Sequence, residues 1–242
     1  MAPDDVSRRL AEVQGSTERL LAALRDPPRD DAHVRQPSLL PGWTRAHVLA
    51  HLARNADALV RTLSGTLRGE RLPMYLGEAE RAADIEAGSR QDAAALVADV
   101  ADSAARLDEV FSRMTPAAWE ADAETRAGPL PARRLIGARW REVEIHRVDL
   151  DEGYGPGDWP ASFVAPLLPS LVDPERLGPR LPAGVAVDVT DTDSGRRWSA
   201  GPDDARRVAV RGPSWALVGW LVGRPSAVRR ELGTPPELTP WS

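Results

Sequence analysis

The sequence contains only four histidines, and three of them stand where they could bind a metal ion. His47 and His51 are four residues apart in one helical pattern, and Glu142 stands four residues before His146 in another. On an α-helix this spacing places two side chains one turn apart on the same face. Two imidazoles and one carboxylate with an open fourth position are typical of catalytic zinc. The spacing predicts a site of His51, Glu142 and His146; His47 is an alternative to His51, and a solvated Glu–His pair is the structural alternative.

Two residue types are absent from the sequence, and their absence restricts the chemistry. The chain has no cysteine, so it cannot supply a thiolate nucleophile, a thiolate zinc ligand or a disulfide. It also has no lysine, because all 31 basic residues are arginine, and this excludes a lysine Schiff base. A substrate carboxylate held by a cation must therefore be held by arginine, and a sulfur nucleophile must come from outside the chain.

Apolar residues recur at helical spacing through most of the first 151 residues. Thr44 and Asp92 stand at the N-cap positions of two such segments, and proline follows closely after residues 4–25 and 93–114. Four long amphipathic helices and one short one predict a four-helix bundle, in which the histidine-bearing faces can point inward. The expected helices span residues 4–25, 44–68, 77–87, 93–114 and 132–151.

The remainder of the chain has a different pattern, because 15 of the 22 prolines lie at or after Pro129. The glycine-rich stretch 153–157 is typical of a linker, and no predicted strand precedes it as a dinucleotide-binding loop would require. Beyond it the sequence predicts helices at 161–172 and 214–222, strands at 185–189 and 207–211, and a third strand around 196–198. The fold class is therefore α+β, with a helical bundle over residues 1–152 and a smaller mixed domain over residues 153–242.

Composition excludes several classes of function. The chain has 242 residues with a net charge of −5, and its arginines are mixed with acidic residues along its length. A nucleic-acid-binding protein needs a concentrated basic face, so we expect no nucleic-acid partner. No apolar run is long enough to span a bilayer, and the first residues are acidic where a signal peptide would be basic. We therefore expect no membrane partner and a cytoplasmic location, and we expect a monomer because no self-complementary apolar stripe is evident.

Two segments resemble a known family. The segment from Leu40 to Asn55, Leu-Pro-Gly-Trp-Thr-Arg-Ala-His-Val-Leu-Ala-His-Leu-Ala-Arg-Asn, resembles the N-terminal domain of mycothiol-dependent maleylpyruvate isomerases. That domain belongs to the DinB-like metal-binding helical bundles. The segment from Arg141 to Leu150, Arg-Glu-Val-Glu-Ile-His-Arg-Val-Asp-Leu, resembles the family's second motif. Pro73-Met74-Tyr75, Arg81 and Gly223-Arg224 are also similar to the isomerases, so the resemblance covers nearly the whole chain.

The resemblance implies both a site and a reaction. Carried over by position, His51, Glu142 and His146 are the ligands of Zn²⁺ or another divalent metal, so His47 is not a ligand. Arg224 matches an arginine that the family needs for activity, and Arg81 is a second candidate for holding a carboxylate of a dicarboxylate substrate. The implied activity is cis-trans isomerisation of maleylpyruvate to fumarylpyruvate with mycothiol as the thiol cofactor, a step of aromatic-compound catabolism.

Two other functions remain open at this stage. A mycothiol S-transferase would use the same metal and thiol but would release a stable adduct with a different electrophile. A non-catalytic, metal-stabilised binding module would lose thermal stability when the metal is removed and would show no thiol-dependent turnover.

Overall fold

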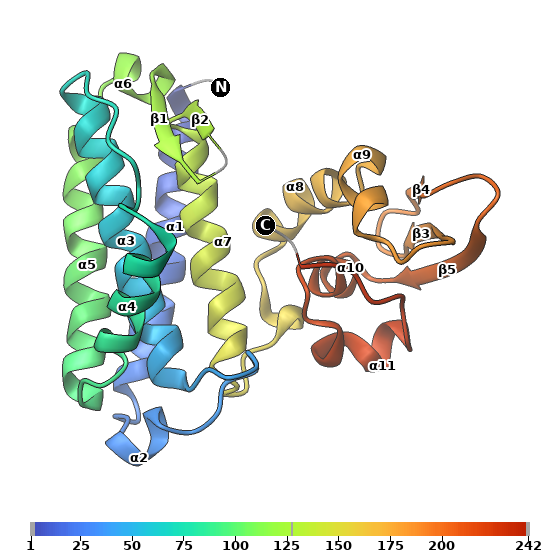
Figure 1. Cartoon of the computed structure of the whole chain (residues 1–242), viewed down its shortest axis with the longest axis horizontal. Coiled ribbons are helices and arrows are strands. Elements are labelled where there is room, and N and C mark those ends of the chain that lie inside the picture. Colours follow the sequence, from blue (N-terminus) through green and yellow to red (C-terminus); the bar gives the residue numbers. More distant parts are fainter. Residues whose placement is uncertain (1–2, 127, 241–242) are drawn as a thin grey trace. The chain divides into compact units, whose positions relative to one another are not determined.

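The computed structural model describes residues 3–126 and 128–240, and Figure 1 shows its ribbon. The chain divides into two compact units, residues 1–152 and 153–242. The fold is mixed α+β, as the sequence predicts, and the first unit is mainly helical.

The first unit is built around four long helices that run side by side (Figure 1). Helix α3 packs against both α5 and α7, and α1 packs against α5 and α7. The predicted long helices are confirmed to within a few residues. Their bounds are α1 Pro3–Arg25, α3 Arg45–Leu67, α5 Ala93–Arg113 and α7 Arg134–Asp149. The short helices of this unit are α2 Asp31–Val34, α4 Glu78–Gly88 and α6 Pro116–Glu120.

Both predicted N-caps stand at the start of their helices. The Asp92 side chain accepts a hydrogen bond of 2.7 Å from the Ala95 backbone N–H, which satisfies a free donor of the first turn of α5. At the start of α3 the backbone N–H of Thr44 donates to Nδ1 of His47 over 3.2 Å. The third residue of α3 thus closes back onto its cap, so the N-terminal end of this helix is fixed a single turn before His51.

Helix α3 is the most buried of the long helices, and most of its residues belong to the core. Its small residues Ala46, Ala50 and Ala53 are fully buried, which lets neighbouring helices approach closely. Leu49 and Leu52 pack into the same apolar cluster as Leu96 of α5 and Val143 of α7. A polar side chain on the inner face of α3 is therefore held rigidly against the neighbouring helices.

The first unit also contains a β-hairpin that the helical pattern did not predict. Strands β1 (Asp122–Thr125) and β2 (Gly128–Pro131) pair antiparallel, with Asp122 opposite Pro131. Each strand has four residues, and Pro129 and Pro131 remove backbone donors, so the segment shows no strand-like alternation. The segment was predicted only as a connection between two helices, and this prediction was incomplete.

The second unit combines a three-stranded sheet with short helices. The strand order is β4-β3-β5, with β3 antiparallel to β4 and parallel to β5. All three predicted strands are present, and each is longer than predicted: β3 Val185–Asp191, β4 Arg197–Ala200 and β5 Arg206–Gly212. The helices are α8 Ala161–Leu171, α9 Pro174–Leu177, α10 Ser214–Leu221 and α11 Arg229–Leu232. Within the described residues, no helix has the length and apolar character needed to cross a membrane.

Candidate metal centre

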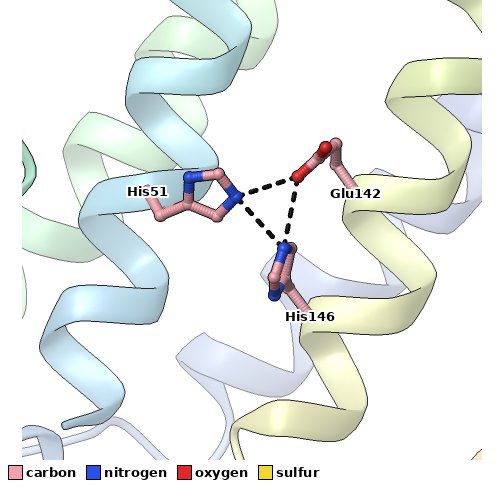
Figure 2. A group of neighbouring side chains, drawn as sticks. All are labelled: His51, Glu142 and His146. Carbon is pink, nitrogen blue, oxygen red and sulfur yellow. Dashed lines mark hydrogen bonds and ion pairs between the residues drawn. The ribbon is translucent and has the colours of Figure 1, made fainter. Parts of the chain in front are cut away.

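Three metal-binding side chains converge between α3 and α7. His51 comes from α3, and Glu142 and His146 come from α7 (Figure 2). Their donor atoms all lie within 4.8 Å of one another. His51 Nε2 lies 2.9 Å from Glu142 Oε2 and 3.1 Å from His146 Nε2, and the last two atoms are 3.3 Å apart. Glu142 and His146, which the four-residue spacing places on one face of α7, thus meet His51 of α3 across the interface of the two helices.

A buried arginine fixes the register of the two helices beside the cluster. Arg139 is only 2% exposed, and its Nη1 donates to the Leu52 carbonyl over 2.8 Å and to Asn55 Oδ1 over 2.9 Å. Asn55 stands one turn after His51 on α3, and Arg139 stands one turn before Glu142 on α7. Burial lowers the pKa of Arg139 to about 10, so its guanidinium keeps its charge at neutral pH and favours an anionic Glu142.

Asp149 orients one of the histidines. Its Oδ2 lies 2.8 Å from His146 Nδ1, and the Asp149 side chain is fully buried. A proton on Nδ1 that is shared with this carboxylate leaves the lone pair of Nε2 directed into the cluster. Asn55, one turn after His51, has a different role, because its Oδ1 accepts the hydrogen bond from Arg139.

The protonation of the cluster follows from burial and from contacts among its members. Burial lowers the pKa of His51, against the opposing hydrogen bond with Glu142. Burial opposes ionisation of Glu142, but hydrogen bonds with His146 and His51 hold the pKa of Glu142 well below its ordinary value. Burial also opposes the charged form of His146, but hydrogen bonds with Asp149 and Glu142 raise its pKa. An ionised Glu142 and a neutral His51 are the states in which these groups bind a metal ion.

Arg81, the catalytic candidate in the first unit, lies at the edge of this cluster. It belongs to the first turn of α4, and its Nη2 lies 3.3 Å from Nδ1 of His51. Its Cζ atom lies 5.5 Å from the centre of the Tyr75 ring. The guanidinium is only half-buried, so it can reach both the cluster and solvent.

Two other side chains of the same helices, His47 of α3 and Glu144 of α7, lie outside the cluster. His47 Nδ1 is used at the cap of α3, and its Nε2 lies 3.2 Å from Glu86. Glu144 is buried on another side of α7, where it accepts a hydrogen bond of 2.5 Å from Ser16. The alternative in which His47 replaces His51 therefore does not match the structure.

Arg224, the catalytic candidate in the second unit, follows the C-terminus of α10. Its Nη1 donates to the Val222 carbonyl over 2.7 Å, as expected for an arginine that satisfies a free carbonyl at a helix end. This contact describes the arginine within its own unit, and a role of Arg224 in catalysis remains a prediction.

Sequence reasoning missed one aromatic neighbour of the cluster. The Trp43 ring stacks on His47 with a centroid distance of 6.1 Å and meets the His51 ring edge-on at 5.6 Å. Trp43 immediately precedes the Thr44 cap, a position from which a side chain can fold back over the first turns of a helix. The place of Trp43 directly before the predicted cap was the sequence signal that could have identified this neighbour of the cluster.

Comparisons with known proteins show which family shares this sequence and fold. Residues 10–151 match the model of the mycothiol maleylpyruvate isomerase N-terminal domain. The chain is similar to a crystal structure of the mycothiol-dependent maleylpyruvate isomerase, with 30% identity over 98% of this chain and 97% of that chain and a TM-score of 0.85. It is equally similar in identity and coverage to a histidine-to-alanine mutant of that enzyme, with a TM-score of 0.84. No curated protein sequence matches the chain.

The fold and the site together define a class of protein, a helical bundle with a two-histidine, one-glutamate cluster that is followed by a small α+β unit. The chain belongs to the family of mycothiol-dependent maleylpyruvate isomerases, and it is an isomerase.

Proposed function

We propose that the chain converts maleylpyruvate to fumarylpyruvate, with mycothiol as the thiol and a divalent metal, zinc in the first instance, held by His51, Glu142 and His146. The observation that carries the proposal is the convergence of these three donors within 4.8 Å in a member of this family. The absence of cysteine supports the dependence on an external thiol, because the chain has no sulfur nucleophile of its own.

The donor set fits zinc. Two imidazole nitrogens and one carboxylate oxygen leave a fourth position open, as catalytic zinc sites do. Zinc–ligand bonds of about 2.0–2.2 Å at a tetrahedral centre require donor separations of about 3.4 Å. The observed separations of 2.9, 3.1 and 3.3 Å are close to this requirement. The hydrogen bond from Asp149 supports the His146 ring in the orientation that a ligand needs.

A bound zinc ion would lower the pKa of a thiol at the open position, so that the sulfur is present as thiolate at neutral pH. The Glu142 carboxylate and one thiolate together balance the two positive charges of the ion, which makes a partly buried site tolerable. The residues themselves serve to hold the three ligand atoms in place, and Asp149 accepts the Nδ1 proton of His146 so that Nε2 is left to bind the ion.

The proposed reaction is a reversible addition. The thiolate sulfur forms a bond to one carbon of the cis double bond, and the π electrons of that bond move to the conjugated carbonyl oxygen as an enolate. The former double bond is now single and rotates. The enolate electrons then re-form the double bond in the trans configuration as the thiolate leaves, so no thiol is consumed.

Arginine side chains are proposed to bind the anionic groups of this reaction, the substrate carboxylates and the enolate oxygen. The Arg81 guanidinium can hold a carboxylate or the enolate oxygen through paired hydrogen bonds. A His51 ring that commits its Nε2 lone pair to a cation carries its proton on Nδ1, and Nδ1 then no longer accepts from Arg81. The Arg81 donor is thereby released for the substrate. Arg224 is proposed as a second arginine that acts on the substrate.

The test is conversion of maleylpyruvate by zinc-loaded protein with and without mycothiol. Rapid, thiol-dependent formation of fumarylpyruvate with unchanged mass supports the proposal. A thiol adduct of increased mass would indicate an S-transferase instead. Zinc-bearing protein that forms neither fumarylpyruvate nor a thiol adduct would contradict the proposal and would favour a metal-stabilised binding module.

A further inference from the structure

The first unit contains a cavity of about 320 Å³ beside the metal cluster. It lies between α3, α4 and the segment that joins them, residues 68–77. Arg81 lines the cavity, and its Nη2 lies 3.3 Å from Nδ1 of His51, so this one side chain contacts both the cavity and the cluster. Its volume is at the lower end of the range for small-molecule sites, about 300–1,000 Å³.

The charged lining of this cavity is balanced. Three arginines and three acidic residues line it: Arg54, Asp57, Arg61, Glu80, Arg81 and Asp84. A dicarboxylate seated wholly inside the cavity would meet three negative side chains, which offset the attraction of the arginines, whereas Arg81 can still reach a substrate carboxylate on its cluster side. A neutral ligand with many hydroxyl groups could use both the guanidinium donors and the carboxylate acceptors, because each hydroxyl both donates and accepts.

Some of these groups are already held in place, and others remain available. Arg54 Nη2 lies 2.7 Å from Asp99 and 2.9 Å from Asp57, which fixes that wall of the cavity on α3. Arg61 Nε donates to the Pro73 carbonyl over 3.0 Å and holds the joining segment against α3. Glu80 and Asp84 are exposed, and neither forms an ion pair within the described part of the chain.

The aromatic lining suits the same class of ligand. Tyr75 is half-buried and lines the cavity, with its ring 5.5 Å from Cζ of Arg81. Burial raises the pKa of Tyr75, so its hydroxyl is neutral at physiological pH. A flat ring among charged side chains can contact the C–H face of a polyol ring while its neighbours bond the hydroxyls.

We propose that this cavity binds the polyol part of the thiol cofactor. The inference rests on the proposed function, in which the thiol is mycothiol. Mycothiol is a cysteine joined by an amide to two linked, polyhydroxylated six-membered rings. Seating the rings between α3 and α4 would place the cysteine end beside Arg81, whose Nη2 lies 3.3 Å from Nδ1 of His51.

The three methionines offer a direct probe of this cavity. Met74 lines it, whereas Met114, at the end of α5, is only 8% exposed and does not line it. The ligand is N-acetylglucosaminyl-inositol, a neutral, thiol-free form of the polyol part of mycothiol that keeps its amide, titrated into full-length protein with ¹³C-labelled methionine methyl groups. We expect a saturable shift of the Met74 resonance and an unchanged Met114 resonance. No shift of Met74, or an equal shift of both, would overturn the inference.

A matched pair of variants tests the acidic wall. The double variant Glu80→Gln, Asp84→Asn removes two exposed carboxylates that line the cavity. The control Glu78→Gln, Asp102→Asn removes two exposed carboxylates that do not line it. We expect affinity for the polyol to fall about tenfold in the first variant, as for the loss of one or two hydrogen bonds to charged groups, and to stay unchanged in the control. Equal affinity in both variants would overturn the inference.

Maleate, a dicarboxylate, tests whether the cavity binds the substrate instead of the polyol. A Met74 shift with maleate but not with the polyol would assign the cavity to the substrate and overturn the inference. The outcome is separable from that of the proposed function, since binding of the thiol-free polyol needs neither metal nor turnover. Mycothiol-dependent isomerisation without polyol binding at Met74 would overturn this inference alone, and polyol binding without isomerisation would overturn the proposed function alone.

Discussion

Helix α7 carries two polar clusters on different sides, one facing α3 and one facing α1. On the α3 side, Glu142 meets His51 and His146 at 2.9 and 3.3 Å. On the α1 side, Glu144 accepts from Ser16 at 2.5 Å, and the Ser16 hydroxyl in turn accepts from Trp140 Nε1 at 2.9 Å. The two glutamates are two residues apart, which is about 200° around the helix axis.

The difference between the clusters is in their donors and acceptors. In the α1 cluster each acceptor faces a committed donor, so the network is satisfied and structural. In the α3 cluster the His146 Nδ1 proton is shared with Asp149, and the lone pair of Nε2 therefore faces the Glu142 carboxylate. Converging lone pairs need a positive charge between them. A binding site is thus distinguished by metal-binding atoms from two helices that converge on one point, whereas the other network only holds helices together.

The largest expected effect is that of His51→Ala. Removing one of three ligands should abolish stable metal binding and lower mycothiol-dependent turnover about 10³-fold, since metal catalysis contributes several kcal/mol. Metal analysis and a rate assay measure both losses. The control is His33→Gln, because His33 pairs with Glu152 away from the cluster, and it should retain metal and activity. A His51→Ala protein with full turnover would contradict the account.

Arg224→Gln should separate substrate contacts from metal contacts. Loss of one donor to a developing negative charge typically costs about 10²–10³-fold in rate. We therefore expect turnover to fall about 10²-fold while metal content stays at the wild-type value, with only a small fall in melting temperature from the lost contact with the Val222 carbonyl. Unchanged steady-state kinetics would exclude a role of Arg224 in the reaction.

Asp149→Asn should have a smaller effect on the same centre. Partners that orient a metal-binding histidine typically contribute about 10–100-fold to metal affinity. A competition titration with a chelator of known affinity should therefore show weaker zinc binding by that factor. Wild-type affinity in this variant would mean that the 2.8 Å contact with His146 does not support the site.

Glu144→Gln should change stability without changing metal binding. The buried carboxylate would be replaced by an amide that pairs less well with Ser16, at a cost of about 1–3 kcal/mol. The melting temperature should fall by several degrees, as such a cost implies for a chain of this size. Loss of metal in this variant would show that the two clusters on α7 are not independent.

Much of the fold was predictable from local signals. Helical periodicity located the four long helices, and alternation located the three strands of the second unit, because both patterns repeat over enough residues to be read. Helices α2, α6, α9 and α11 and the β1–β2 hairpin were missed because each element has only four or five residues, too few to show a repeating pattern. Their positions depend on packing that a local pattern does not encode.

The site was predictable in part for a related reason. The four-residue spacing pairs Glu142 with His146 on one face, but it treats His47 and His51 alike. The structure separates them, since His47 closes the cap at Thr44 and His51 lies one turn deeper in the core. The approach of Arg81 from α4 depends on tertiary packing, and so does the balanced lining of the cavity; neither could be read from spacing.

The most direct test of the account is the metal content of Glu142→Gln and Glu144→Gln, measured side by side after zinc loading and dialysis. Both variants lose one carboxylate from the same helix, so they differ only in the cluster that is altered. The account predicts close to one zinc per chain in wild-type protein and in Glu144→Gln, and a large loss in Glu142→Gln. Equal zinc content in the two variants, or none in the wild type, would contradict the assignment of the metal site to His51, Glu142 and His146.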